Sequence, residues 1–171
     1  MLRAFLEVNA MKEITIYTDG SWKRHRQRGG WSCLLVDWPH WTLLAGDCPD
    51  TTISRMELSA VVAGLSALVM PCRVHIISDS TYVCDCVNTW LSRWVKNKWV
   101  GANGNRVQNV DLLWKLANLM KIHRVTAHWT KSHTGKRSVD ALGNACVDCF
   151  AQWGSDGRYM PVPDYETSVK L

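Results

Sequence analysis

The chain is 171 residues long and 47% hydrophobic, enough for one globular domain with a real core and too short for two comfortable ones. Its longest apolar run, residues 58–70, is too short to span a bilayer, so we predict no membrane role. The net charge of +5 suits an anionic partner, although ordinary solubility charge would look the same. An odd number of Cys residues, seven, and a first segment unlike a signal peptide favour free thiols and a reducing, cytoplasmic location.

The amino-terminal part of the chain predicts three strands. Alternating apolar residues over 14–18 form the first, and Gly20 should end it, which places Asp19 at its carboxyl end. Two more short strands, over residues 31–37 and 41–46, follow across tight turns. Together the three predict an antiparallel meander.

The later segments alternate between helical and strand patterns. A helix is predicted from about residue 55 to residue 70 with Ser54 as its N-cap, and a strand over 73–78 ends at Asp79. The remaining pattern predicts a helix over 80–94, a basic and aromatic loop over 95–108, a helix over 110–120, a strand over 122–129 and a helix over 138–153. This order is typical of an α/β sheet covered by helices. We predict one domain, 13–153, between tails over 1–12 and 154–171.

Four acidic residues stand out by their positions. Asp19 and Asp79 end strands, and they emerge at the same edge if those strands are neighbours in a parallel or mixed sheet. Glu57 lies one turn into a helix and Asp148 lies inside the last helix. Carboxylates are the ligands that suit Mg²⁺ and Mn²⁺, and two such ions about 3.5–4 Å apart can activate water against a phosphodiester. A metal-binding acidic cluster is therefore predicted.

Three of these acids also have ordinary structural interpretations. Glu57 could complete a capping box with Ser54, and Asp79 could cap the helix that begins at Ser80. Asp148 could be a solvated surface acid. From the residues alone, these alternatives remain open.

Four short blocks in chain order resemble the signature of the type 1 ribonuclease H family. They are Thr18-Asp19-Gly20-Ser21, Arg55-Met56-Glu57-Leu58, Ser78-Asp79-Ser80 with Tyr82-Val83, and Gly143-Asn144 with Asp148. The resemblance covers roughly residues 13–153, and four blocks together are far more specific than one. It implies the ribonuclease H-like fold, a five-stranded mixed sheet flanked by helices.

The same resemblance implies an activity. It is hydrolysis of the RNA strand of an RNA/DNA hybrid by a two-metal-ion mechanism, which leaves 5′-phosphate and 3′-hydroxyl ends. Two Mg²⁺ or Mn²⁺ ions would be held by Asp19, Glu57, Asp79 and Asp148, which become the catalytic acids. The protein is expected to act as a monomer.

His133 matches the family's loop histidine, which is thought to handle proton transfer or to help the product leave. Its plain alternative is an exposed His in a polar loop. The interval from His133 to Asp148 is longer than in familiar bacterial enzymes and resembles that of some retroelement ribonuclease H domains. Asp140 lies nearer His133, but only Asp148 has the family's spacing from Gly143-Asn144, so we predict Asp148.

The basic and aromatic run over residues 90–99 resembles the family's basic protrusion, in which Trp residues line a channel for the DNA strand. Positive charge can track phosphates and indole faces can pack on sugars or bases. The residues expected to bind nucleic acid there are Trp90, Trp94, Lys96, Lys98 and Trp99. Trp90 and Trp94, spaced four apart, could instead anchor a core.

Thr52 and Asn109 match family residues that hold a phosphate of the DNA strand. Among the departures from the family pattern, two concern charge. Asp50 stands where a basic residue commonly supports that pocket, and the loop over 22–28 lacks the usual Asn-Pro-Gly. We expect Asp50 to weaken the grip on the DNA strand and the Arg and Lys residues of the loop to contact the hybrid by charge.

Two other functions are compatible with this fold. One is a catalytically silent module that binds nucleic acid or proteins, which the four acids and His133 disfavour. The other is a different nuclease of the superfamily, such as a resolvase or transposase core. The basic protrusion and the histidine loop disfavour that class.

Overall fold

The computed structural model describes residues 11–131 and 138–158, and within them five strands form one mixed sheet in the order β3-β2-β1-β4-β5. The strands are β1 (Lys12–Lys23), β2 (Arg28–Asp37), β3 (His40–Pro49), β4 (Cys72–Ser78) and β5 (Arg124–Trp129). The first three run antiparallel as a meander, whereas β4 is parallel to both β1 and β5. The predicted fold class is confirmed.

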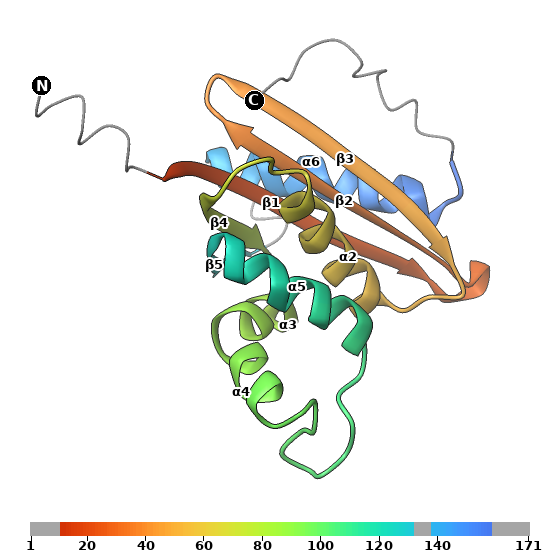
Figure 1. The fold of residues 1–171 in the computed structure, drawn as a ribbon. Coiled ribbons are helices and arrows are strands. Elements are labelled where there is room, and N and C mark those ends of the chain that lie inside the picture. Colours follow the sequence, from red (N-terminus) through yellow and green to blue (C-terminus); the bar gives the residue numbers. More distant parts are fainter. Residues whose placement is uncertain (1–10, 132–137, 159–171) are drawn as a thin grey trace, which may run out of the picture.

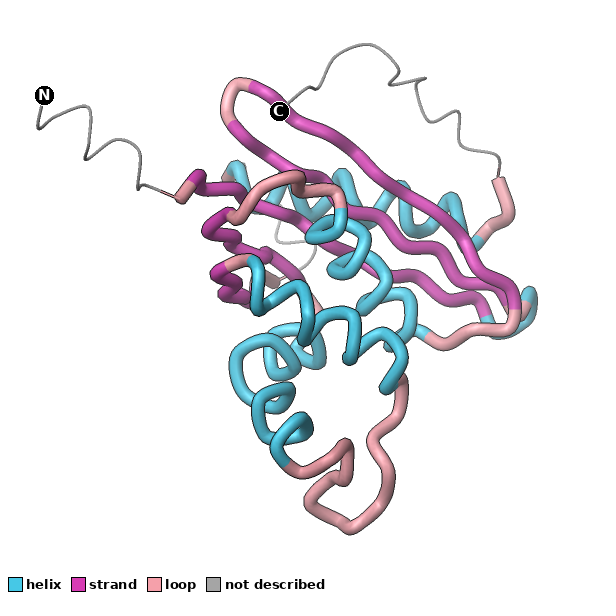
Figure 2. The backbone as a smooth tube through the Cα atoms, in the orientation of Figure 1, coloured by secondary structure: helices cyan, strands magenta, loops and turns pink. Residues whose placement is uncertain are grey.

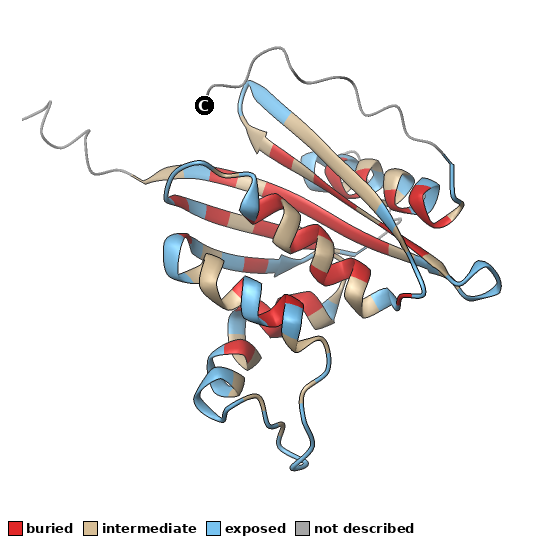
Figure 3. Ribbon diagram, turned by 45° about the vertical axis from the view of Figure 1, so that its right-hand side comes forward, coloured by how far each residue is buried: buried red, intermediate tan, exposed pale blue. Residues whose placement is uncertain are grey.

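Helices cover both faces of the sheet (Figure 1). They are α2 (Ile53–Ser66), α3 (Thr81–Asp85), α4 (Leu91–Lys96), α5 (Val110–Ile122) and α6 (Val139–Ser155). The long helix α6 lies on one face, against the meander, and α2 crosses the other face with α5 packed beside it. The buried residues concentrate where α2 meets the central strands (Figure 3). Ile16 of β1, Ile76 of β4 and Leu58 of α2 are all fully buried there.

The first strand does not end at Asp19, which corrects the prediction. Gly20 and Ser21 continue β1 as far as Lys23 because they still pair with Trp31 and Gly30 of β2. The pairing of β1 with β4, however, stops at Thr18 and Ser78. Asp19 therefore lies one residue beyond the last pair between β1 and β4. This is the predicted edge of the sheet, although β1 itself does not end there.

The amino-terminal ends of two helices settle two of the open alternatives. Helix α2 begins at Ile53, slightly earlier than the predicted start at about residue 55, because Thr52 is its N-cap. The Thr52 Oγ1 accepts a hydrogen bond from the backbone amide of Arg55 at 3.4 Å. The helix ends at Ser66 instead of residue 70. Ser80 caps α3 through its own hydroxyl. Neither Glu57 nor Asp79 is needed as a cap.

The predicted helix over 80–94 is divided into three parts. Between α3 and α4, residues Cys86–Trp90 form a wider π-helical segment. Asn88 in this segment bonds the outer edge of β5, donating to the Ala127 carbonyl at 2.8 Å and accepting from its amide at 3.0 Å. These paired bonds satisfy the edge strand as another strand would, a long-range contact that no local pattern reveals.

Candidate active site and nucleic-acid interface

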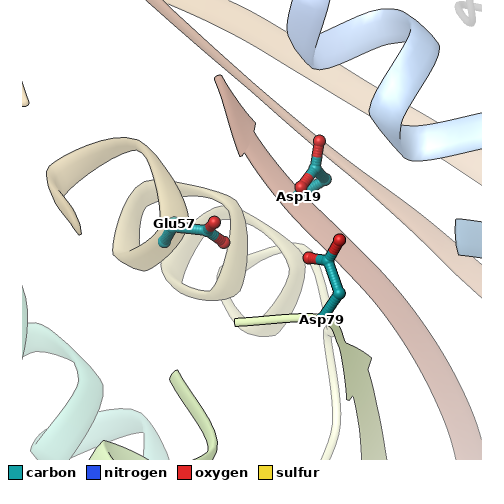
Figure 4. A group of neighbouring side chains, drawn as sticks. All are labelled: Asp19, Glu57 and Asp79. Atoms are coloured by element: carbon teal, nitrogen blue, oxygen red, sulfur yellow. The ribbon is translucent and has the colours of Figure 1, made fainter. Parts of the chain in front are cut away.

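Three of the predicted acids converge at the carboxyl end of β4. Asp19 comes from β1, Glu57 from α2 and Asp79 from the residue after β4, and their side chains point toward one another (Figure 4). One carboxylate oxygen from each lies within 4.8 Å of the others. Asp79 is further fixed because the Trp129 indole N–H donates to its carbonyl at 2.9 Å. The three residues are distant in sequence and meet because β1 and β4 are neighbours in the sheet and α2 packs on β1.

Gly20 explains how Glu57 reaches this position. A Cβ added at residue 20 would lie 2.5 Å from the backbone nitrogen of Glu57 and 2.9 Å from the carbonyl carbon of Met56. Only a residue without a side chain therefore allows the first turns of α2 to approach β1 so closely. In the Asp19-Gly20 pair, Asp19 therefore supplies one carboxylate, and Gly20 makes the close contact with α2 that brings the Glu57 carboxylate beside it.

Helix α6 places the fourth predicted acid, Asp148, near the same site. Gly143 lets the helix approach, since a Cβ there would lie 2.7 Å from the Tyr17 ring. Ser32 of β2 lies opposite Asp19 of β1, and its hydroxyl donates to the Val147 carbonyl of α6 at 2.5 Å. The adjoining residue Asp148 is half-buried, accepts from the Gln152 amide at 2.7 Å, and its charge acts on Asp19.

The competing acid, Asp140, has a different environment. It lies in the first turn of α6 and accepts a hydrogen bond from the Tyr17 hydroxyl at 2.8 Å. Burial, followed by this bond to Asp140, raises the pKa of Tyr17 well above its ordinary value. Asp140 thus ties the start of α6 to β1, whereas the charges that act on Asp19 are those of Asp79 and Asp148.

The site is electrostatically strained in the protein alone. Burial, together with the charges of Asp79 and Asp148, raises the pKa of Asp19 to about 8, against the opposing hydrogen bond from the Gly20 amide. Burial and the charges of Asp19 and Asp79 raise the pKa of Glu57 to about 9. Clustered carboxylates out of contact with water resist ionisation, and a bound cation removes that penalty.

The donor set fits a hard divalent cation. All three converging groups are carboxylates, the ligand type that Mg²⁺ and Mn²⁺ prefer. In addition, Glu57 Oε2 is buried and has no hydrogen-bond partner among the described residues. A buried polar atom without a partner is costly, so an oxygen left in this state is well suited to ligate an ion.

A groove of about 860 Å³ is lined by residues of α3, the π-helical segment, α4 and the loop before α5, together with Ser54 at the start of α2. Its walls include Tyr82, Trp90, Arg93, Trp94 and Asn109. The Trp90 and Trp94 rings are 5.4 Å apart and tilted, and Tyr82 continues the row at 6.2 Å from Trp90. Aromatic faces with an Arg beside them form a surface on which a sugar-phosphate strand can pack.

The other predicted binding residues of the protrusion are placed differently. Lys96 is the last residue of α4, whereas Lys98 and Trp99 lie in the segment between α4 and α5, which is a loop in Figure 2. Lys96 and Lys98 are exposed, so their charges reach solvent. Trp99 packs against the core instead of the groove, and Trp90 and Trp94 also contact the core. The two interpretations of Trp90 and Trp94 are therefore compatible.

Two departures noted in the sequence take specific positions. In the loop over 22–28, Lys23 forms an ion pair with Asp156, Arg28 pairs with Asp47, and Arg26 donates to the Asp156 carbonyl at 2.6 Å. Much of this loop's positive charge is thus already engaged within the protein. Asp50 is exposed and has a left-handed backbone, with its amide bonded to the Gln27 carbonyl at 2.8 Å.

Several residues of the site escaped the sequence analysis. Tyr82 and Arg93 line the groove, Ser32 and Trp129 fix the backbone beside two acids, and Arg55 links α2 to α5. Tyr82 and Arg55 lie within the quoted signature blocks, which was the only available signal. His133 lies outside the described residues, so its predicted role stays a prediction.

Comparison with known proteins identifies the family. The ribonuclease H family model matches residues 11–156. The ribonuclease H of Erythrobacter litoralis is 43% identical over 141 residues, covering 81% of this chain and 98% of the relative. That of Chlorobium phaeobacteroides is 42% identical over 142 residues, covering 82% and 94%. The chain belongs to the ribonuclease H family and is an enzyme of that family.

Solved structures show the same fold. The type 1 ribonuclease H called LC9-RNase H1 superposes with a TM-score of 0.73 at 21% identity, covering 88% of this chain and 75% of that one. The ribonuclease H domain of prototype foamy virus superposes with a TM-score of 0.71 at 24% identity, covering 90% and 99%. Within the described residues, none of the helices has the length and apolar character needed to cross a bilayer.

Proposed function

We propose that the protein hydrolyses the RNA strand of RNA/DNA hybrids, with divalent metal ions held by Asp19, Glu57, Asp79 and Asp148. The observation that carries the proposal is the convergence of three buried or half-buried carboxylates, one of which has an oxygen without a partner among the described residues. Family membership supplies the substrate class, and a foamy virus protease-reverse transcriptase has been solved in complex with an RNA/DNA hybrid.

Each residue has a distinct part in this proposal. Two Mg²⁺ or Mn²⁺ ions, when bound, would activate a water and stabilise the leaving oxygen, giving 5′-phosphate and 3′-hydroxyl ends. Asp19, Glu57 and Asp79 each supply a carboxylate oxygen to the same small group. Asp148 adds negative charge from α6. His133, in its polar loop, assists departure of the product from the active site.

The groove supports binding of the second strand. Trp90, Trp94 and Arg93 provide stacking surface and charge for the DNA strand, and Lys96 and Lys98 extend the positive surface. Thr52 and Asn109 hold one of its phosphates. Recognition should therefore follow duplex shape and 2′-hydroxyls more than base sequence.

The direct test is cleavage of labelled RNA/DNA hybrid, duplex RNA and duplex DNA, each with Mg²⁺, Mn²⁺ or EDTA. We expect the RNA of the hybrid alone to be cut, only with metal, and end-group analysis to find 5′-phosphates. Cutting of duplex DNA would indicate a different nuclease of the superfamily. Binding of the hybrid without any cutting would indicate a silent module.

Metal affinity is expected to depend on pH. Because the metal-free carboxyls of Asp19 and Glu57 have pKa values raised to about 8 and about 9, a bound cation must displace protons at neutral pH. The apparent affinity for Mg²⁺ should rise steadily between about pH 6 and about pH 8. Calorimetric titration in buffers of different ionisation enthalpy measures both the affinity and the protons released. Affinity that stays constant over this range, with no proton release, would contradict the raised pKa values.

A further inference from the structure

Arg55 occupies a junction between two distant parts of the chain. Its guanidinium forms a two-pronged ion pair with Asp111 of α5, with N–O distances of 2.9 and 2.7 Å. The same group donates to the Asn109 side-chain oxygen at 3.4 Å. Its backbone amide donates to Thr52 Oγ1, also at 3.4 Å. One residue thus contacts both of the side chains proposed to hold the DNA phosphate.

Asn109 is held from two sides. Its backbone is left-handed, with φ of 58°, and its side chain does not cap α5. Burial raises the pKa of Tyr82 to about 12, whereas a side-chain hydrogen bond with Asn109 lowers it. A lowered pKa is expected when the Asn109 carboxamide donates to the phenol oxygen. A carboxamide has two N–H groups and one oxygen. With the oxygen turned toward Arg55, one N–H remains to donate into the groove that Asn109 and Tyr82 line.

Arg55 itself is not arranged as a phosphate ligand. The residues that line the groove, within the described ranges, include Ser54 and Asn109 but not Arg55. Its charge is already paired, and its hydrogen bond lowers the pKa of Asp111 to about 2. A planar guanidinium with both terminal nitrogens in use fixes its partners in direction more than a Lys ammonium would.

We propose that Arg55 is a positioning residue: locked by Asp111, it sets the orientation of the Asn109 carboxamide so that an N–H meets a phosphate of the DNA strand. This rests on the proposed function, because it assumes a hybrid in the groove. It adds a specific role for a side chain that touches neither the nucleic acid nor the metal-binding acids.

The test uses hybrids in which one DNA phosphate at a time is replaced by an uncharged methylphosphonate. The wild-type enzyme should show one position where the replacement raises KM about tenfold, the size expected for losing one charge-assisted hydrogen bond. Asn109→Ala should remove that sensitivity. Arg55→Ala should remove it as well, with KM for the unmodified hybrid about tenfold higher and kcat within about twofold of wild type.

Matched variants separate positioning from general stabilisation. Arg73→Ala removes an Arg that joins two strands instead of two helices, with its Nε 3.5 Å from a Glu13 carboxylate oxygen, and should leave the sensitive position unchanged. If Arg55→Ala fails to fold, Asp111→Asn keeps the Arg55 guanidinium but removes its ion-pair partner. This variant should be less sensitive to the methylphosphonate replacement than wild type. Arg55→Lys should restore thermal stability without restoring the sensitivity.

Three outcomes are decisive against the inference. Wild-type sensitivity retained in a folded Arg55→Ala or Asp111→Asn variant means that Arg55 is merely a structural link between α2 and α5. Full rescue by Arg55→Lys means that charge alone is required. A wild-type enzyme that cuts the hybrid but has no sensitive phosphate also overturns it. Failure of the wild-type enzyme to cut any hybrid would instead overturn the proposed function.

Discussion

Replacing Asp19 with Asn should abolish cleavage of an RNA/DNA hybrid while leaving binding of the hybrid measurable. Asp19 supplies one of the three carboxylate oxygens that lie within 4.8 Å of one another, so its replacement removes a ligand of the proposed metal site. The groove and its aromatic residues lie on other elements and should be unaffected. Cleavage is measured with labelled hybrid in Mg²⁺, and binding by fluorescence anisotropy in the same buffer.

The same variant should be more stable than wild type when no metal is present. The pKa of Asp19 is about 8 in the folded protein, above its ordinary value, so the folded state resists its ionisation. The resulting destabilisation is absent below about pH 4, grows as the pH rises and is complete above about pH 8. Asn should therefore raise the free energy of unfolding at neutral pH by on the order of 1 kcal/mol or more.

Denaturant unfolding with EDTA and with Mg²⁺ checks this. Mg²⁺ should stabilise the wild-type protein markedly and Asp19→Asn much less. Asp85→Asn, an exposed acid of α3, is the charge-matched control and should cleave normally. Full cleavage by Asp19→Asn would rule out the metal-site assignment, and a loss of stability in EDTA would contradict the strained carboxylate cluster.

Replacing Gly20 with Ala should damage the site through its geometry, without altering any charge. The new methyl group would meet the backbone of Met56 and Glu57, which cannot move as a flexible side chain can. Crowding of this kind costs about 2–3 kcal/mol of stability, and moving a catalytic group by about 1 Å can cost roughly 100-fold in rate. We expect both effects, measured by thermal unfolding and by kcat on the hybrid.

Ser21→Ala provides the comparison at the adjacent residue. It removes the hydroxyl that lies 2.9 Å from the Ser155 hydroxyl, a contact with the end of α6, and should cost only about 1 kcal/mol. Its kcat should remain close to that of wild type. If Gly20→Ala is as stable and active as Ser21→Ala, the close approach of α2 to β1 does not control the position of Glu57.

Local patterns were sufficient for most elements of the fold. Period-two and helical spacing identified every strand and the long helices, because each element buries one face. They misplaced boundaries where a distant partner decides them. β1 continues past Gly20 because β2 supplies hydrogen bonds there, and the helix over 80–94 widens where Asn88 bonds β5. Such bonds join residues far apart in sequence and leave no local trace.

The candidate site divides in the same way. The sequence by itself determined which residue types are available: an acid next to the Gly of a strand pattern, an acid after a second strand, one on each of two helices, and an aromatic and basic segment. Only the tertiary structure decided that Thr52 and Ser80 are the caps, that Asp140 is bound to Tyr17, and that Arg55 joins Thr52 to Asn109. The reason is physical: residue chemistry and periodicity are local properties, whereas burial, convergence of charges and hydrogen-bond partners exist only once the sheet has brought separate segments together.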